Sequence, residues 1–227
     1  MSLRGCFVTG TDTGAGKTVV AAAIAAALHG RGARVAVWKP VVTGLDEPAP
    51  DGWPADHELL AAAVGGHPRD VTTATFGPAV SPHLAAELAE QTLDLGALAD
   101  AARAAARGAD VLVAEGVGGL LVPFGGFTVR DLAVALGLPL VVAARPGLGT
   151  INHSLLTIEA ARSAGLDVRA VVLTPWPPQP GVMARSNQAT IEQLGAVEVA
   201  TLAATTPAVD DLARAGATLP FDRWLGP

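Results

Sequence analysis

A glycine-rich segment near the start of the chain limits the possible folds more than any other feature of the sequence. The segment, residues 10–18, reads GTDTGAGKT and lies between an apolar run at 6–8 and an alanine-rich helical pattern at 19–28. A strand, a glycine-rich turn and a helix in this order are typical of a phosphate-binding loop, where backbone N–H groups and a helix N-terminus surround an anion. The alternative is a glycine-rich turn with a chance Gly-Lys-Thr, and the flanking strand and helix argue against it. The segment therefore predicts binding of a nucleoside triphosphate.

The residues of this loop have separate expected tasks. Lys17 should reach the β- and γ-phosphates, and the Thr18 hydroxyl should ligate Mg²⁺. The spacing departs from the common pattern, because Thr11 and not a glycine stands five residues before Gly16. The expected nucleotide contacts within the loop are Gly14, Ala15, Gly16, Lys17, Thr18 and Val19.

Apolar runs of strand length alternate with helical patterns along the chain, which is typical of a parallel sheet with crossover helices. Strands are expected at 5–9, 34–39, 110–114, 138–144, 168–173 and 197–202. Pro40 should end the second strand, and Gly116–Gly119 should form a turn after the third. Helices are expected at 16–29, 55–64, 94–107 and 183–194, from Ser81-Pro82 onward, and from a cap at Thr150 or Asn152 to 164; residues 44–54 should be an exposed loop. The pattern predicts one α/β domain over residues 1–227, with a doubly wound, mostly parallel sheet of the P-loop NTPase type.

Composition excludes several other classes of protein. Half of the residues are hydrophobic and 16% are charged, as in a globular chain. The net charge of −6, without a cluster of Lys and Arg, argues against a nucleic-acid partner. Cys6 is the single cysteine, so it is expected in the core of a protein from a reducing compartment. No signal peptide is visible, and apolar runs such as 138–144 are too short to cross a bilayer. We therefore expect a cytoplasmic protein without membrane contact.

Polar residues at strand ends are informative, because sheets of this kind bind ligands at the carboxyl ends of their strands. Lys39 ends the second strand, with Thr43 shortly after it. It is either the point where the chain meets solvent or a second cation for a transferring phosphoryl group. The run 111–115 is typical of a Walker B strand with Glu115 in place of aspartate, which would hold Mg²⁺. Asp56 can be a helix cap, a first-turn acid or a further metal ligand, and the sequence leaves these readings open.

Five short segments form a combination that is more specific than any one of them. They are VTGTDTxxGKT at 8–18, WKPVxTG at 38–44, SPH at 81–83, EGxGG at 115–119 and LGTINH at 148–153. In this order they resemble dethiobiotin synthetase. The resemblance implies ATP-dependent ring closure of 7,8-diaminononanoate (7,8-diaminopelargonate) with CO₂ in biotin biosynthesis. Dethiobiotin, ADP and phosphate would form through a carbamate and a carbamic–phosphoric anhydride.

The resemblance also implies roles for individual residues. Lys39 would be the catalytic lysine, and it would bracket the carbamate and the γ-phosphate together with Lys17. The implied ligands of Mg²⁺ are Thr18, Asp56 and Glu115. Further nucleotide contacts would come from Asp56, Glu115, Gly116, Val117, Gly118, Thr174 and Pro175. The family is a homodimer with its sites at the subunit interface. Thr13 and Thr43 would hydrogen-bond the diamine or carbamate, and the neighbouring chain's Gly149, Thr150, Ile151 and Asn152 would hold the substrate's carboxylate.

Three positions depart from the pattern of that family. Gly14 stands where some members carry an acidic residue. Thr174-Pro175 stands where some have an Asn-Asp pair that reads adenine, which leaves the preference for ATP over other triphosphates open. Gly147 stands where some have a lysine near the substrate's carboxylate, and Arg145 is the expected replacement for that charge.

A switch ATPase of the ParA/MinD type is the main alternative, because such proteins share the expected fold and bind partners in a nucleotide-dependent way. They carry an additional lysine near the start of the phosphate loop. Residues 11–13 occupy that stretch here and include no lysine. Turnover of ATP that depends on a small-molecule substrate would distinguish a synthetase from such a switch and from a pure binding module.

Overall fold

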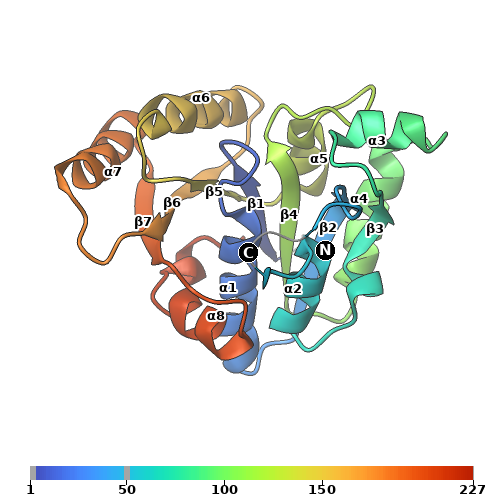
Figure 1. The fold of residues 1–227 in the computed structure, drawn as a ribbon, viewed down its shortest axis with the longest axis horizontal. Coiled ribbons are helices and arrows are strands. Elements are labelled where there is room, and N and C mark those ends of the chain that lie inside the picture. Colours follow the sequence, from blue (N-terminus) through green and yellow to red (C-terminus); the bar gives the residue numbers. More distant parts are fainter. Residues whose placement is uncertain (1–3, 49–51, 227) are drawn as a thin grey trace.

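One parallel sheet of seven strands forms the centre of the computed structural model, which describes residues 4–48 and 52–226. The strands are β1 (Gly5–Gly10), β2 (Val35–Val42), β3 (Thr72–Thr75), β4 (Val111–Gly119), β5 (Leu140–Ala144), β6 (Val168–Trp176) and β7 (Glu198–Ala203). Their spatial order is β3-β2-β4-β1-β5-β6-β7 (Figure 1). The strands β2, β3 and β4 lie on one side of β1, and the later strands β5, β6 and β7 lie on the other side. The carboxyl end of β1 therefore lies at the point where the strand order reverses, which is the usual place of a ligand.

Helices cover both faces of the sheet. They are α1 (Lys17–Gly30), α2 (Asp56–Ala63), α3 (Pro82–Leu88), α4 (Leu95–Ala105), α5 (Val129–Leu136), α6 (Thr150–Arg162), α7 (Val182–Gly195) and α8 (Val209–Gly216), with 3₁₀ turns at Pro68–Asp70 and Phe221–Arg223. The helices α1, α2 and α8 pack in one apolar layer, and α3 to α7 pack in the other (Figure 1). The doubly wound α/β fold predicted from the alternating pattern is confirmed. In the described part of the chain, no helix combines the length and the apolar character needed to cross a membrane.

The expected strands are all present, but three of them, β2, β4 and β6, end three or more residues later than predicted. Pro40 does not end β2, which continues to Val42. Lys39 donates its N–H to the Val71 carbonyl on the β3 side, so the missing N–H of Pro40 falls on the β4 side. Pairing with β4 has already ended there, at Trp38 opposite Ala114, and proline therefore costs no ladder hydrogen bond.

Two further strands also run past their expected ends. The segment Gly116–Gly119 continues β4, and Gly10 of β1 pairs with Gly119 after a shift of register. Thr174 and Pro175 continue β6 to Trp176, three residues beyond the expected end at 173. Residues 49–51, in the middle of the loop expected at 44–54, lie outside the described residues.

Local details at two helix starts differ from the expectation. Gly149, with φ of 92°, occupies the N-cap position of α6, so neither Thr150 nor Asn152 is the cap. Ser81 is at the N-cap position of α3 as expected, but its hydroxyl contacts His83 Nδ1 at 2.9 Å and caps no backbone N–H. Cys6 is fully buried, which confirms its place in the core.

Candidate active site

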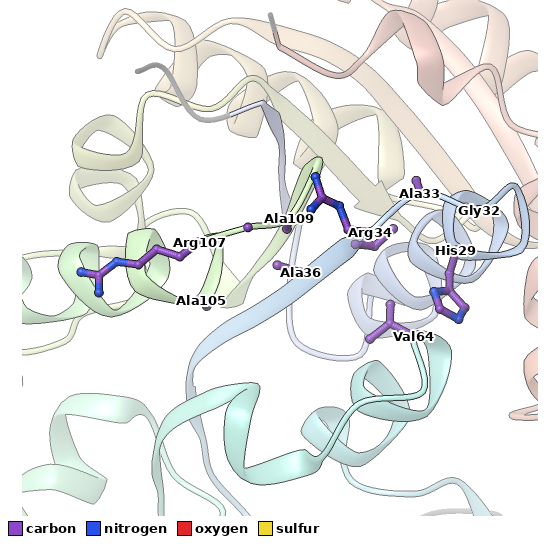
Figure 2. Close-up of a pocket in the computed structure, with 11 residues that line it drawn as sticks. His29, Gly32, Ala33, Arg34, Ala36, Val64, Ala105, Arg107 and Ala109 are labelled. Atoms are coloured by element: carbon purple, nitrogen blue, oxygen red, sulfur yellow. The ribbon is translucent and has the colours of Figure 1, made fainter.

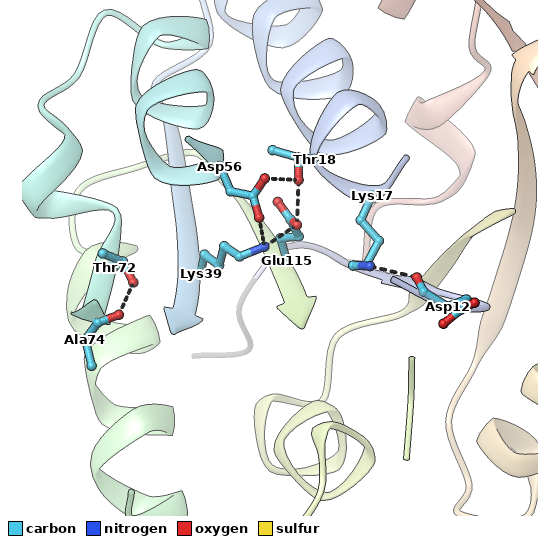
Figure 3. A network of polar contacts seen from close by, with 8 residues as sticks. All are labelled: Asp12, Lys17, Thr18, Lys39, Asp56, Thr72, Ala74 and Glu115. Carbon is cyan, nitrogen blue, oxygen red and sulfur yellow. Dashed lines mark hydrogen bonds and ion pairs between the residues drawn. The ribbon is translucent and has the colours of Figure 1, made fainter. Parts of the chain in front are cut away.

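Four polar side chains from separate segments meet at the carboxyl end of the sheet: Thr18, Lys39, Asp56 and Glu115 (Figure 3). Lys39 Nζ lies 2.5 Å from Glu115 Oε1 and 2.7 Å from Asp56 Oδ2. The Thr18 hydroxyl lies 2.9 Å from Asp56 Oδ1 and 2.9 Å from Glu115 Oε1. We call these four residues the polar cluster. The structure thus brings together both predicted Mg²⁺ carboxylates, the predicted hydroxyl ligand and the predicted catalytic lysine.

The elements explain why these side chains meet. Thr18 is in the first turn of α1, directly after the glycine-rich loop, and Glu115 follows the buried apolar run of β4. Asp56 is the first residue of α2, with Ala55 at the N-cap, so it is a first-turn acid and a partner of Lys39 at once. Lys39 and Glu115 are only 2% and 0% exposed. An ordinary solvated strand end, which was one reading of Lys39, is therefore wrong.

The charges of the cluster balance one another in a nearly dry environment. Burial acts to lower the pKa of Lys39, but the carboxylates of Asp56 and Glu115 outweigh it and raise that pKa. For Asp56, burial acts to raise the pKa, and the Lys39 ammonium more than offsets it, so the pKa is lowered. Burial raises the pKa of Glu115, and Lys39 opposes this rise only in part. Lys39 contacts both carboxylates directly, and the ammonium of Lys17 also acts to lower the pKa of each carboxyl group.

The residues of the cluster suit Mg²⁺. Glu115 Oε2 is buried and has no hydrogen-bond partner among residues 4–48 and 52–226. A single hydroxyl hydrogen on Thr18 cannot satisfy two carboxylate oxygens at once, so a cation at this position would relieve a conflict. Over residues 4–48 and 52–226, no group of three His, Cys, Asp or Glu side chains forms a metal site by itself. Two carboxylates and a hydroxyl leave positions for phosphate oxygens and water, as Mg²⁺ requires.

Lys17, the only other lysine of the sequence, lies beside the cluster. Its Nζ donates to the backbone oxygen of Asp12 at 3.0 Å, within its own loop (Figure 3). Burial lowers the pKa of Lys17. The Asp12 carboxylate accepts a hydrogen bond from the Thr13 N–H at 2.7 Å and lies 3.5 Å from Arg145. Both lysines of the chain thus lie at the carboxyl end of the sheet, Lys39 inside the polar cluster and Lys17 beside it.

The loop has the shape that an anion requires. Gly14 and Gly16 have φ of 71° and 88°, values that favour glycine. A Cβ on Gly16 would lie 2.5 Å from Thr174 Cγ2, so the end of β6 packs against the loop. A Cβ on Gly118 would lie 3.5 Å from Thr13 Oγ1, so the glycines of β4 approach the loop from the other side. Thr174 and Gly118 thus lie beside the predicted phosphate site.

The remaining predicted residues differ in their relation to the cluster. Thr43 follows β2, and Gly149–Asn152 begin α6; in the described part of the chain, no hydrogen bond joins either segment to the cluster. Gly116 packs between Phe7 and Val129, where a Cβ would be within 3.0 Å of both. Ala15 is buried, Val19 and Val117 are half-buried, and Pro175 is exposed. These residues surround the site at different depths.

Sequence reasoning missed two residues that organise this region. Asp12 lies inside the glycine-rich loop, directly before Thr13, and this place in the motif was the only usable signal, because its contact with Arg145 joins residues far apart in the sequence. Asn187 of α7 donates to two carbonyl oxygens before α6, at Pro146 and Gly147. No motif marks Asn187, because its partners are more than thirty residues away in the sequence.

A surface cavity of about 480 Å³ lies elsewhere, at the amino end of the sheet (Figure 2). Its lining includes His29 near the end of α1, Arg34 before β2 and Arg107 after α4. Figure 2 shows the Arg107 guanidinium pointing along α4 and away from His29. The cavity contains none of the predicted site residues.

Comparison with known proteins finds a matching family model and relatives that share one name. The family model described as an AAA domain matches residues 4–215. The chain is 40% identical over 216 residues to the ATP-dependent dethiobiotin synthetase BioD of Anaeromyxobacter dehalogenans (strain 2CP-C), covering 94% of this chain and 95% of that protein. It is 40% identical to the protein of that name from Mycobacterium avium (strain 104), covering 96% of each chain.

A relative from Anaeromyxobacter sp. (strain Fw109-5) with the same name is 44% identical over 174 residues, covering 75% of this chain and 76% of that one. Among solved structures, a ParA family ATPase from Chlorobium tepidum TLS aligns with a TM-score of 0.55 at 11% identity, covering 94% of this chain and 90% of that chain. At this identity the likeness to the ParA protein shows the P-loop fold alone.

Proposed function

The chain belongs to the family of ATP-dependent dethiobiotin synthetases, ligases of biotin synthesis, and we propose that the polar cluster is where it uses ATP to close a cyclic urea. The observation that carries the proposal is the position of Lys39, a buried ammonium between two carboxylates that also contact the phosphate-loop hydroxyl of Thr18. Such a site can hold a metal-bound triphosphate and a second anion together.

The proposed substrates are 7,8-diaminononanoate and CO₂. One amine adds to CO₂ and loses a proton, which gives a carbamate. A carbamate oxygen attacks the γ-phosphorus, and ADP leaves. The second amine then attacks the carbonyl carbon of the anhydride and loses a proton. The bond between that carbon and the phosphate oxygen breaks, and phosphate leaves with the bonding electrons. A carbamate becomes a useful electrophile only once its oxygen is a leaving group, which is the reason for the ATP.

Lys17 and Lys39 have complementary roles in this proposal. Both reactants of the phosphoryl transfer are anions, so their approach requires fixed positive charge. Lys17 leaves the Asp12 carbonyl to contact the β- and γ-phosphates. Lys39 keeps its proton, since its pKa is raised, and its ammonium holds the carbamate oxygen near the γ-phosphate.

Mg²⁺ is part of the proposal, with Thr18, Asp56 and Glu115 as the residues that would hold it. When bound, the ion neutralises charge on the phosphate oxygens. Asp56 and Glu115 also orient Lys39, so these carboxylates would keep ammonium and phosphate at a fixed separation. Glu115 Oε2, which is buried and finds no partner in the part of the chain that the structure describes, supports this role.

We further propose a homodimer in which the N-terminus of α6 contacts the substrate's carboxylate in the neighbouring subunit. The contacts would come from Gly149, Thr150, Ile151 and Asn152. Thr13 and Thr43 would hydrogen-bond the diamine or carbamate, and Arg145 would supply the positive charge that Gly147 lacks. The segment Thr174-Pro175 would lie against the nucleotide base, with Thr174 already packed on Gly16.

The whole chain, residues 1–227, would act as one synthetase domain. A cytoplasmic location is proposed as well, because the reaction consumes ATP, which cells maintain there.

Phosphate release from Mg-ATP and bicarbonate, with and without 7,8-diaminononanoate, tests the proposed function. We expect release that depends on the diamine and an organic product with the mass of dethiobiotin. Release that is indifferent to the diamine, without that product, would overturn the proposal and favour a nucleotide-dependent switch.

A further inference from the structure

The amide of Asn187 lies where it can control the shape of the α6 N-terminus. We infer that Asn187 is a positioning residue for recognition of the substrate's carboxylate, which it serves by fixing the turn at 146–149 without touching the substrate. The inference rests on the proposed function, in which the first residues of α6 bind that carboxylate.

Asn187 is a buried donor with a defined task. It lies on α7 and is 6% exposed. Its Nδ2 donates to the Pro146 oxygen at 3.0 Å and to the Gly147 oxygen at 3.2 Å. Burial of an amide is unfavourable unless it is hydrogen-bonded, and these two bonds use both hydrogens of the group. The contacts join α7 to a turn that is forty residues away in the sequence.

The turn is held from both ends. The Gly147 oxygen that accepts from Asn187 also accepts from the Thr150 N–H at 3.3 Å. Gly149 follows with φ of 92° at the N-cap of α6, and it has no side chain that could cap the helix. Asn187 does not cap the helix, because it donates to carbonyl oxygens, but it holds the turn that leads into α6.

The first turn of α6 is left open to an anion. An α-helix does not satisfy its first N–H groups, and the N-terminus carries positive potential. The His153 N–H donates to the Gly149 oxygen at 3.1 Å. Over the described ranges 4–48 and 52–226, the N–H groups of Ile151 and Asn152 have no acceptor, and the buried Thr150 hydroxyl has no partner. These groups belong to the helical turn that directly follows the segment contacted by Asn187.

Loss of the Asn187 donor should change the turn more than the core. The body of α6 packs in the apolar layer through Ile158 and Ala161, far along the helix from Gly147. Asn187→Asp keeps the shape of the side chain, but it cannot donate and places a carboxylate against two carbonyl oxygens. The first turn of α6 would then lose its fixed orientation, while the phosphate loop keeps its own contacts.

Steady-state kinetics of Asn187→Asp in the full chain test the inference. We expect the KM for 7,8-diaminononanoate to rise about tenfold, which corresponds to about 1.4 kcal/mol, with kcat and the KM for ATP within about twofold of wild type. Asn187→Gln, which restores an amide donor, should recover part of the affinity for the diamine.

Gln188→Glu is the matched control. Gln188 is the next residue of α7, and its amide donates to the Val199 carbonyl of β7 at 3.3 Å, away from the turn. This variant should leave the KM for the diamine unchanged. If it raises that KM as much as Asn187→Asp, general loosening of α7 explains the effect and the inference fails.

A substrate without the carboxylate provides the sharpest readout. For 2,3-diaminooctane, the diamine in which hydrogen replaces that group, Asn187→Asp should leave kcat/KM unchanged. An equal loss with both diamines, or a loss confined to kcat, would overturn the inference. If Asn187→Asp does not fold, the same comparison is made with Asn187→Gln, where a diamine-specific rise in KM supports the inference and an equal loss overturns it. Absence of diamine-dependent turnover in the wild type would instead overturn the proposed function.

Discussion

Lys39 illustrates how one side chain can be buried and still charged. Its ammonium is enclosed by the carboxylates of Asp56 and Glu115, at 2.7 and 2.5 Å. A buried ion pair is weak evidence for stability, since desolvation can exceed the attraction between the charges. In a chain with only two lysines, a buried lysine beside a phosphate loop is better explained by chemistry than by folding.

Lys39→Gln should therefore separate catalysis from binding. We expect kcat to fall by about 10²-fold or more, because a positive charge at the transferring phosphoryl group is lost. Affinity for Mg-ATP, measured by calorimetry, should stay within a few-fold of wild type. Lys17→Gln is the comparison, and it should weaken nucleotide binding as well. Equal loss of turnover and nucleotide affinity in Lys39→Gln would point to a structural role instead.

Cys6 predicts a pH dependence of stability. Burial raises the pKa of its thiol from 9.0 to about 12. Above pH 9.0 the unfolded chain loses the proton and the folded chain keeps it, so the contribution to stability is present below that pH and is lost as pH rises toward 12. The free energy of unfolding of wild type, relative to Cys6→Ala, should fall by up to about 1.4 kcal/mol per pH unit in this range. Denaturant titrations of both proteins at two alkaline pH values measure this difference in the free energy of unfolding. A difference that stays constant between the two pH values would contradict the prediction.

Elements with a strong local pattern could be predicted from the sequence, and weakly patterned ones could not. The strand–loop–helix unit from Gly5 to Gly30 has an apolar strand, a glycine-rich turn and a long alanine-rich helix. In contrast, β3 reads TTAT and is only partly buried, so it has no apolar run to reveal it. Helix α5 was not predicted, although Thr128 and Asp131 form a capping box at its start. Helix α8 was not predicted either, although the Asp210-Asp211 pair in its first turn is a similar signal of a helix start.

Gly216 shows that α8 packs more closely on α1 than its composition suggests. A Cβ on Gly216 would overlap the backbone carbonyl of Ala23. Gly216→Ala should therefore lower the free energy of unfolding by about 1–3 kcal/mol, although alanine is the better helix former. Gly30→Ala is the control, since a Cβ there would meet no atom of the described residues within 4 Å. Denaturant titration of both variants makes the comparison, and equal stability of the two would contradict the close packing of α1 and α8.

The assembly of the site could be predicted in outline because strand ends are shared by neighbouring strands. Glu115, Lys39 and the loop at Gly10 each follow an apolar run, and parallel strands bring such ends to one edge of the sheet. The contact of Asp12 with Arg145, and that of Asn187 with Gly147, depend on how loops and helices pack across the fold. No local pattern records such contacts, so the sequence could not predict them.

The proposed homodimer predicts recovery of activity when two inactive variants are mixed. Lys39→Gln removes the catalytic charge, and Asn152→Asp places a negative charge near the substrate's carboxylate. If each site takes Lys39 from one subunit and α6 from the other, reassociation in equal amounts gives about a quarter of wild-type activity at low diamine concentration. A site built within one subunit gives no recovery. The two variants are dissociated, mixed in equal amounts and diluted to allow reassociation. The activity of the mixture is then compared with that of each variant treated alone.

Transfer of oxygen from CO₂ to phosphate tests most directly the claim that the cluster phosphorylates a carbamate. The enzyme is given ¹⁸O-labelled CO₂, ATP and 7,8-diaminononanoate in unlabelled water for a time too short for exchange. One labelled oxygen should appear in the released phosphate and one in the carbonyl of the ring product. Unlabelled phosphate beside a labelled ring would contradict the account, because the γ-phosphoryl group would then have gone to water and not to the carbamate.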